Sequence, residues 1–148
     1  MENVTNPVRW GNLHWLNIIF LTLSPLVAIV AVAWHALTFG ITWVEFGIFF
    51  FWYFACGLAI TVGYHRLYAH RSHEAALPLR ILYAAFGAGA FENSILEWCS
   101  DHRLHHKETD NDTDPYDATK GFLWSHVLWM VVGKDHSNPD YTNVRDLE

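Results

Sequence analysis

Residues 16–34 read LNIIFLTLSPLVAIVAVAW and contain no charged side chain. At a rise of 1.5 Å per residue, this stretch forms about 28 Å of α-helix, close to the hydrocarbon thickness of a bilayer. A second apolar stretch, from Trp43 to Val62, has Glu45 near its start as its only acidic or basic residue. The two stretches predict an all-α membrane protein with transmembrane helices over about residues 15–35 and 43–63. A buried helix in a soluble protein is the competing interpretation of the first stretch.

The composition also favours a membrane protein. Hydrophobic residues make up 52% of the chain and charged residues 16%, whereas soluble domains have about 25% charged residues. The net charge is −6, and no basic stripe is available to bind phosphates, so a nucleic acid partner is not expected. The two cysteines, Cys56 and Cys99, form no CxxC pair. We expect them to be buried small side chains rather than a disulfide or a zinc site.

The connection between the two spans determines the predicted topology. Residues 35–42 form a short turn without charge, so the spans should form an antiparallel hairpin with both ends on one side of the membrane. The basic residues lie in the flanks of this hairpin, at Arg9, Arg66, Arg71 and Arg80. By the positive-inside rule, both flanks are predicted to be cytoplasmic.

Two later apolar stretches are interrupted by polar residues and are short for a span. Residues 77–98 contain Arg80 and Glu92, and we predict a helix there that lies at the membrane interface or packs beneath the functional site. Residues 121–132, GFLWSHVLWMVV, have a similar interfacial character. The hairpin should therefore be followed by cytosolic and interfacial helices.

Five of the ten histidines lie in two short clusters, HRLYAH at residues 65–70 and HRLHH at residues 102–106. On a helix, the three histidines of the second cluster fall within a sector of ~100°, so they can converge on a metal. His65 and His70 are five residues apart, ~140° around an α-helix, which suits two neighbouring metals or a helix end. Sites rich in imidazole suit iron, copper, zinc or nickel.

Acidic side chains near these clusters have two expected roles. A metal-bound imidazole needs an acceptor for its second nitrogen, and the candidates are Asp101, Glu97, Glu92 and Glu108. The DNDTD run at residues 110–114 has neither the glycine nor the final glutamate of a calcium-binding EF-hand loop. We expect that run to be a solvated acidic loop.

The segments that contain these histidines resemble the histidine boxes of the membrane-bound fatty acyl desaturases. GYHRLYAHRSHEA, residues 63–75, is similar to their first box, HxxxxH. EWCSDHRLHHKETDNDTDPYDATKGFLWSHVLWM, residues 97–130, is similar to their second box, HxxHH, and its flanks, with the pattern of the acyl-CoA (stearoyl-CoA) Δ9 type. The resemblance extends from about Trp10 to the last residue, as in the N-terminal portion of such an enzyme.

The resemblance implies an oxidoreductase that uses O2 to introduce a cis double bond, at Δ9, into a saturated acyl-CoA or acyl-lipid chain. It implies a di-iron centre, with metal ligands at His65, His70, His102, His105 and His106. Trp98 would line the acyl tunnel near its bend. Three further positions match polar residues that meet the thioester and carrier end of the substrate, namely Asn17, Asn93 and Asp101.

The same resemblance implies partners and a location. Electrons would come from a small donor such as ferredoxin, a rubredoxin-like protein or cytochrome b5. The chain would be a multi-pass protein of a bacterial inner membrane or the endoplasmic reticulum, in contact with membrane lipid. Its histidine boxes would face the cytoplasm.

One departure from the family pattern concerns the ligand count. The family has a third box, HxxHH, and a further histidine beyond another pair of spans, and residues 1–148 contain neither. We therefore expect a partial desaturase domain, a fragment with little or no desaturase activity of its own. The alternatives are a related membrane di-iron hydroxylase or alkane monooxygenase, which inserts oxygen, and a non-catalytic membrane metal-binding remnant.

Overall fold

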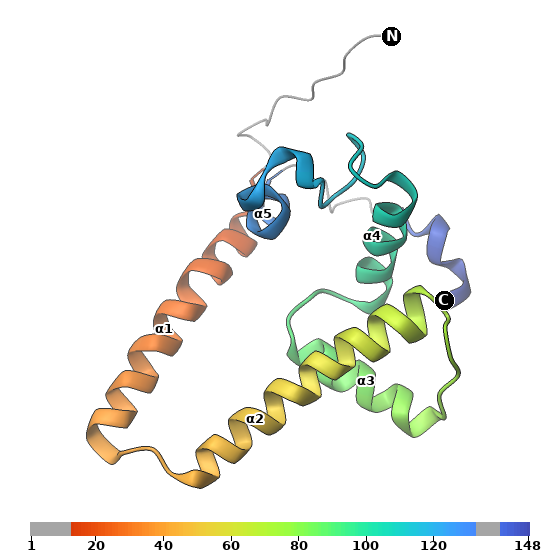
Figure 1. Ribbon diagram of the computed structural model, residues 1–148. Helices are drawn as coiled ribbons and strands as arrows, with labels where there is room; N and C mark the ends of the chain where they lie inside the picture. The colour runs from red at the N-terminus through yellow and green to blue at the C-terminus, as the bar shows by residue number, and fades with distance from the viewer. Residues whose placement is uncertain (1–12, 133–139) are drawn as a thin grey trace. The chain divides into compact units, whose positions relative to one another are not determined.

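The computed structural model describes residues 13–132 and 140–148, and helices are the regular elements of these two ranges (Figure 1). Beside the helices, Leu13 and Val132 form one isolated backbone bridge. The predicted all-helical class is thus confirmed for the described residues. Contacts divide the chain into two compact units, residues 1–41 with 115–138 and residues 42–114 with 139–148. Arg9, used above to predict the topology, lies outside the described residues.

The first unit contains the long helix α1, Trp15–Phe39, with three short helical segments, η3 (Ala118–Lys120), η4 (Trp124–Leu128) and α5 (Trp129–Val131). None of the residues of α1 is buried. The helix ends at Gly40, whose φ of 78° lies in the left-handed region that glycine adopts without steric cost. At its other end, the Asn17 side chain donates a 2.7 Å hydrogen bond to the carbonyl of Met130. This bond joins α1 to α5.

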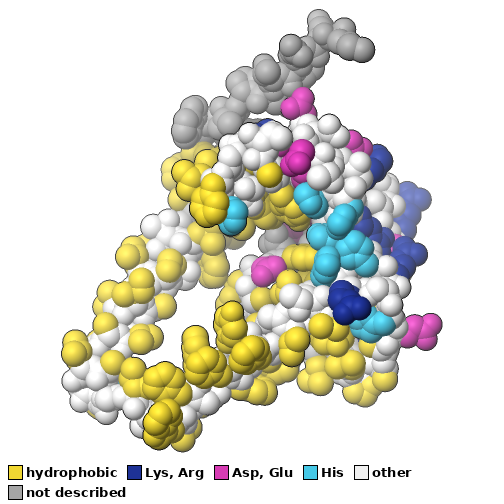
Figure 2. Space-filling model, in the orientation of Figure 1, with side chains coloured by type: hydrophobic (Ala, Val, Ile, Leu, Met, Phe, Trp, Pro, Cys, Tyr) yellow, Lys and Arg dark blue, Asp and Glu magenta, His cyan; other side chains and the backbone are white. Residues whose placement is uncertain are grey.

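The second unit begins with α2, Trp43–Leu58, which continues as the π-helix η2, Ala59–Ala69. A capping box starts α2, because Thr42 and Glu45 each bond the backbone N–H of the other. Both α1 and the continuous helix from Trp43 to Ala69 are long and apolar enough to cross a membrane. Large apolar side chains are exposed along both (Figure 2). The second helix is six residues longer than the predicted span, so it includes His65 and ends next to His70.

Helix α3, Leu77–Gly89, packs against η2 through two reciprocal glycine–tyrosine contacts. A Cβ atom on Gly63 would come within 2.7 Å of the Tyr83 Cβ, and a Cβ atom on Gly87 would overlap the Tyr64 ring. The two backbones approach closely because neither glycine carries a side chain. This contact favours the second of the two predicted placements of this helix, packed beneath the histidines.

The single helix expected over residues 77–98 is in fact two helices. The chain leaves α3 at Ala90 and reaches α4, Ile95–Glu108, through a bend in which Phe91 and Asn93 have φ of 59° and 68°. Ser94 then caps α4, because its Oγ accepts a hydrogen bond from the Glu97 N–H. The apolar pattern of the sequence gave no sign of this bend.

The last described element of the second unit is η5, Thr142–Leu147, which packs on α4. A small apolar core forms there around Ala69, Cys99 and Val144. Cys99 and Cys56 are both free and buried, as expected from the sequence.

Candidate metal centre

The first histidine cluster lies where η2 ends. The N–H of His70 donates to the carbonyl of His65 at 3.0 Å, which is the i to i+5 bond of a π-turn. A π-turn holds one residue more than an α-turn, so residues five apart lie nearly above one another. The Nε2 atoms of the two rings are therefore only 3.0 Å apart. Of the two roles predicted for this pair, two neighbouring metals or a helix end, the second matches the position of His70 at the end of the helix. The predicted angle of ~140° between the two residues was wrong, because it assumed α-helical geometry.

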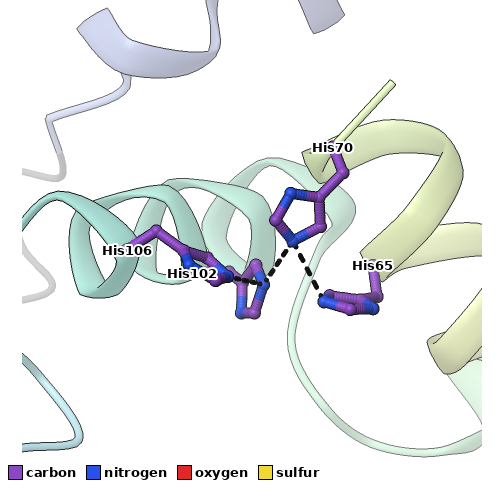
Figure 3. Close-up of side chains that lie close together, drawn as sticks. All are labelled: His65, His70, His102 and His106. Atoms are coloured by element: carbon purple, nitrogen blue, oxygen red, sulfur yellow. Dashed lines mark hydrogen bonds between the residues drawn. The ribbon is translucent and has the colours of Figure 1, made fainter. Parts of the chain in front are cut away.

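The second cluster lies on α4, where His102 and His106 are one turn apart. Their Nε2 atoms are separated by 3.1 Å, and the Nε2 of His102 is 3.0 Å from that of His70 (Figure 3). The ligand nitrogens of the four histidines, His65, His70, His102 and His106, all lie within 4.8 Å of one another. We call these four residues the four-histidine cluster.

The spacing of these nitrogens fits a shared metal ion. Two imidazole nitrogens that bind one ion at ~2.1 Å and at a right angle are ~3.0 Å apart, and the three measured separations are 3.0, 3.0 and 3.1 Å. Four neutral imidazoles are a donor set for iron, copper, zinc or nickel. The residues present therefore fit a transition metal.

The electrostatics of the cluster also favour a metal over protons. Burial and then the neighbouring imidazoles lower the pKa of His102 to about 3, and the same causes lower the pKa of His70. Neutral imidazoles keep a lone pair available at neutral pH, and a metal binds only that form. His70 and His102 are thus prepared for a cation without losing protons first.

His105 does not join the cluster, although the sequence predicted that it would converge with His102 and His106. Its ring centroid is 6.3 Å from that of His102, and its Nδ1 lies 2.9 Å from both carboxylate oxygens of Asp114. The sequence predicted a solvated acidic loop here, but Asp114 is buried, with an exposure of 2%. The carboxylate accepts a hydrogen bond from the Nδ1–H of His105, so Nε2 is the nitrogen that can bind a metal.

Trp98 forms a wall of the cluster. Its indole stacks on the His102 ring, with centroids 4.7 Å apart and planes 22° apart. Its Nε1 donates a 3.0 Å hydrogen bond to Glu92, and Tyr64 contacts the ring edge to face. Glu92 was predicted to accept from a histidine, but here it accepts from this tryptophan, which fixes the indole over His102.

An apolar groove of about 670 Å³ lies between α2 and the end of α3, with Phe49, Trp52, Tyr53 and Ile60 among its lining residues. Its polar end is formed by Glu92, the residue that holds Trp98. The groove therefore reaches the acceptor of the indole that stacks on the cluster. Its lining is mostly apolar, and because several of its side chains are more than half exposed it is an open groove and not an enclosed pocket.

The three polar residues predicted to contact substrate belong to different elements. Asn93 is exposed in the bend between α3 and α4, whereas Asp101 is buried on α4 beside His102. Asn17 belongs to the first unit, where its side-chain amide bonds Met130.

Two residues of the site were not identified from the sequence. Asp114 orients His105, and Arg103 bonds the backbone next to His70. The signal for Asp114 was its place nine residues after His105, but the acidic run around it suggested solvent. Arg103 lies between the ligands of one box, and the sequence alone does not say which segment it contacts.

No family model matches the chain. It is 41% identical to a probable acyl-CoA desaturase of Schizosaccharomyces pombe over 93% of its own length, and 38% identical to human stearoyl-CoA desaturase over 90%. An acyl-CoA Δ11 desaturase of Choristoneura rosaceana is 51% identical over 52% of the chain. The chain spans 28%, 36% and 23% of the lengths of these three relatives.

Proposed function

We propose that this chain, a homologue of the acyl-CoA desaturases over most of its length, supplies one metal-binding part of a membrane enzyme that introduces a double bond into an acyl-CoA. The observation that supports this proposal most is the convergence of four Nε2 atoms from two histidine boxes. An oxygen-dependent desaturase needs such a donor set, and the relatives carry that activity in their names.

In this proposal, the four-histidine cluster binds one iron ion, and His105 binds a neighbouring one through Nε2. When bound, the irons supply the activation of O2 that removal of hydrogen from an unactivated methylene requires. The remaining ligands of the second ion would come from parts of the enzyme that correspond to the rest of the relatives. Asp114 holds His105 in one tautomer, and Trp98 restricts the rotation of His102 and excludes water from that face.

The groove beside α2 is the proposed site of the acyl chain. Its lining is mostly apolar, and Glu92 and Trp98 lie between it and His102. A saturated chain there would gain about 0.8 kcal/mol for each methylene removed from water. The position of the double bond would follow from the depth to which the chain enters. Δ9 is our expectation, while one relative is named as a Δ11 enzyme.

The proposal extends to the surroundings of the site. We infer that α1 and the helix from Trp43 to Ala69 cross the membrane, with the cluster on the cytoplasmic side. A small electron donor, such as ferredoxin, a rubredoxin-like protein or cytochrome b5, would then reach the cluster from the cytosol. Asn17, Asn93 and Asp101 stay proposed contacts of the thioester and carrier end.

A chimaera tests the proposed activity. The aligned part of this chain replaces the matching segment of the Schizosaccharomyces pombe relative, in cells that lack a desaturase of their own. Gas chromatography of fatty acid methyl esters should find a cis-unsaturated product, and the His102→Ala chimaera should form none. A matched His73→Ala chimaera, changed outside the cluster, should retain the product.

The same experiment separates the alternatives. A hydroxylated fatty acid in place of the alkene would assign the chain to the membrane hydroxylases. A chimaera that inserts into the membrane and binds iron, yet forms neither product, would favour a metal-binding remnant and overturn the proposal.

A further inference from the structure

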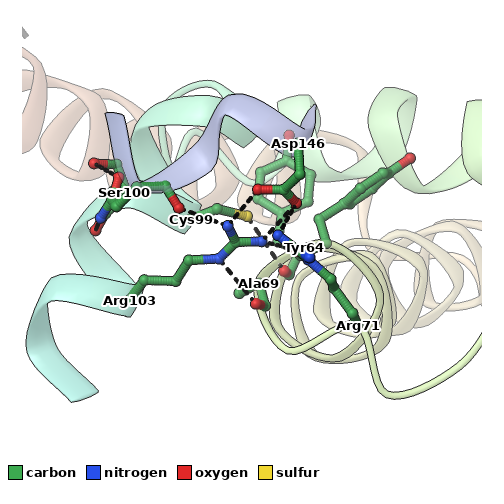
Figure 4. Close-up of polar contacts among 9 residues, drawn as sticks. Tyr64, Ala69, Arg71, Cys99, Ser100, Arg103 and Asp146 are labelled. Atoms are coloured by element: carbon green, nitrogen blue, oxygen red, sulfur yellow. Dashed lines mark hydrogen bonds and ion pairs between the residues drawn. The ribbon is translucent and has the colours of Figure 1, made fainter. Parts of the chain in front are cut away.

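Arg103 connects the two histidine boxes through its guanidinium group. It lies on α4 directly after His102, and its Nε donates to the carbonyl of Ala69 at 3.0 Å while Nη2 donates to the carbonyl of Tyr68 at 2.8 Å. These carbonyls belong to the two residues that precede His70. Figure 4 shows the bond from Arg103 to Ala69 and its pairing with Asp146. One side chain of the second box therefore bonds the backbone that presents a histidine of the first.

The other side of the same guanidinium bonds the segment 140–148. Nη1 and Nη2 pair with the two oxygens of Asp146 at 2.7 and 3.1 Å, and Nη1 also donates to the Asn143 carbonyl at 2.7 Å. Arg71, directly after His70, forms a second ion pair with Asp146 at 2.6 Å. Asp146 thus pairs with an arginine of the second histidine box and with the arginine that directly follows the first.

Independent contacts fix segment 140–148 on α4. The Ser100 hydroxyl donates to the Asn143 Oδ1 at 2.9 Å, and the Asn143 amide donates to the Ser100 carbonyl at 2.9 Å. Val144 is fully buried against Ala69 and Cys99. These contacts, which involve neither arginine, hold the backbone that carries Asp146 in place.

We propose that Arg103 and Asp146 are positioning residues, which hold the two histidine boxes at the separation that the four-histidine cluster requires. The consequence for metal affinity rests on the proposed function. Arginine is needed here, because its planar fork bonds three carbonyls and a carboxylate at once, whereas lysine acts as a point charge. The side chain of Arg103 is 17% exposed, so solvent competes weakly for these bonds.

Hydrogen exchange tests the link between the boxes without any metal. The chain is purified in detergent with Asp146→Asn, and exchange is followed at the amides of His70 and Ser72, which close the end of the first box. We expect exchange there to accelerate about tenfold, because the neutral amide loses both charge-assisted pairs. Asp112→Asn, the same change on an exposed loop residue, should leave exchange unaltered.

Cobalt binding tests the effect on the cluster. Co²⁺ is titrated into the same proteins, and both the dissociation constant and the visible absorption bands of the bound ion are recorded. Changes to residues that orient metal ligands cost about 10–100-fold in metal affinity. We expect a loss in this range and altered bands for Asp146→Asn and Arg103→Lys, but wild-type values for the exposed control Arg145→Lys.

The two readouts separate the possible failures. Unchanged exchange in Asp146→Asn overturns the inference whatever the metal does. Faster exchange with unchanged cobalt affinity and bands also overturns it. The separation of the histidine boxes would then not depend on the ion pair between Arg103 and Asp146. A wild-type chain that binds no cobalt refutes the proposed function, while the exchange result still decides whether the pair joins the boxes.

Discussion

The contact between His105 and Asp114 distinguishes one histidine of the second box from its neighbours. A buried carboxylate fixes the tautomer of His105, whereas His102 and His106 point at other imidazoles. His105 can therefore bind a different metal ion from His102 and His106, although it lies only three and one positions from them in the sequence.

Replacing Asp114 by Asn should affect the metal site of His105 and leave the four-histidine cluster unchanged. The change removes the charge that fixes the Nδ1 proton, so we expect activity of the chimaera to fall about 10–100-fold. The Co²⁺ affinity of the four-histidine cluster should stay within about twofold. Fatty acid analysis and cobalt titration measure the two effects, with Asp112→Asn as the control. A large loss of cobalt affinity would show that the two sites are not separate.

The Asp146 carboxylate makes stability depend on pH. Its bond to Arg103 is the main cause that lowers its pKa to about 2, from 3.8. A lowered pKa stabilises the fold fully above about pH 4, and this stability is lost as the pH falls toward 2. The thermal midpoint of the wild type should exceed that of Asp146→Asn by an amount equivalent to about 1 kcal/mol, after a discount for solvent screening. A difference that persists at pH 2 would contradict this assignment.

At the scale of elements, the decisive feature is the change from α- to π-helix inside one continuous helix. The whole helix from Trp43 to Ala69 has the length and composition of a span, and its π-helical portion brings His65 next to His70. Helix α3 supports this portion through the two glycine–tyrosine contacts. Helix α4 also packs against this portion and supplies the other two histidines.

Gly87→Ala should loosen the packing of α3 on η2. The new methyl group would overlap the ring of Tyr64, which is 2% exposed and has little room to move. Overpacking of this kind costs about 1–3 kcal/mol, so the thermal midpoint should fall by several degrees. Gly47→Ala is the matched control, because nothing lies within 4 Å of its Cβ and alanine favours a helix. Equal midpoints for the two variants would refute the packing argument.

Much of the fold followed from local pattern, and the errors have physical causes. Uncharged apolar length predicted α1 and α2, and histidine spacing predicted that His102 and His106 converge. The π-turn was missed because apolar periodicity was interpreted with α-helical geometry. The bend at Phe91 and Asn93 was missed because left-handed backbone leaves no hydrophobic signal. The contact of Asp114 depends on a loop path that local sequence does not determine.

At the scale of the whole molecule, a membrane would determine the depth at which the apolar helices and the four-histidine cluster lie. Large apolar side chains are exposed along α1 and α2, which in water would be an aggregation risk. A bilayer removes that risk and would leave the end of η2, with its histidines, near the interface.

Cysteine labelling tests this placement. In a Cys56→Ala, Cys99→Ala background, single cysteines are introduced at Ile41, between the two apolar helices, and at exposed Glu74, after the first box. In sealed inside-out vesicles, an impermeant maleimide should label Glu74→Cys at once and Ile41→Cys only after permeabilisation. Labelling of both from one face would contradict a helix that crosses the bilayer between them.

The most direct test of the account is a count of metal ions on the purified chain. Equilibrium dialysis against Fe²⁺ without oxygen, followed by mass spectrometry of the metal, measures ions per chain for the wild type, His102→Ala and His73→Ala. The account predicts one tightly bound ion in the wild type and in His73→Ala, and a loss of at least about tenfold in affinity in His102→Ala. Equal iron content in all three proteins would contradict the assignment of a metal to the four-histidine cluster.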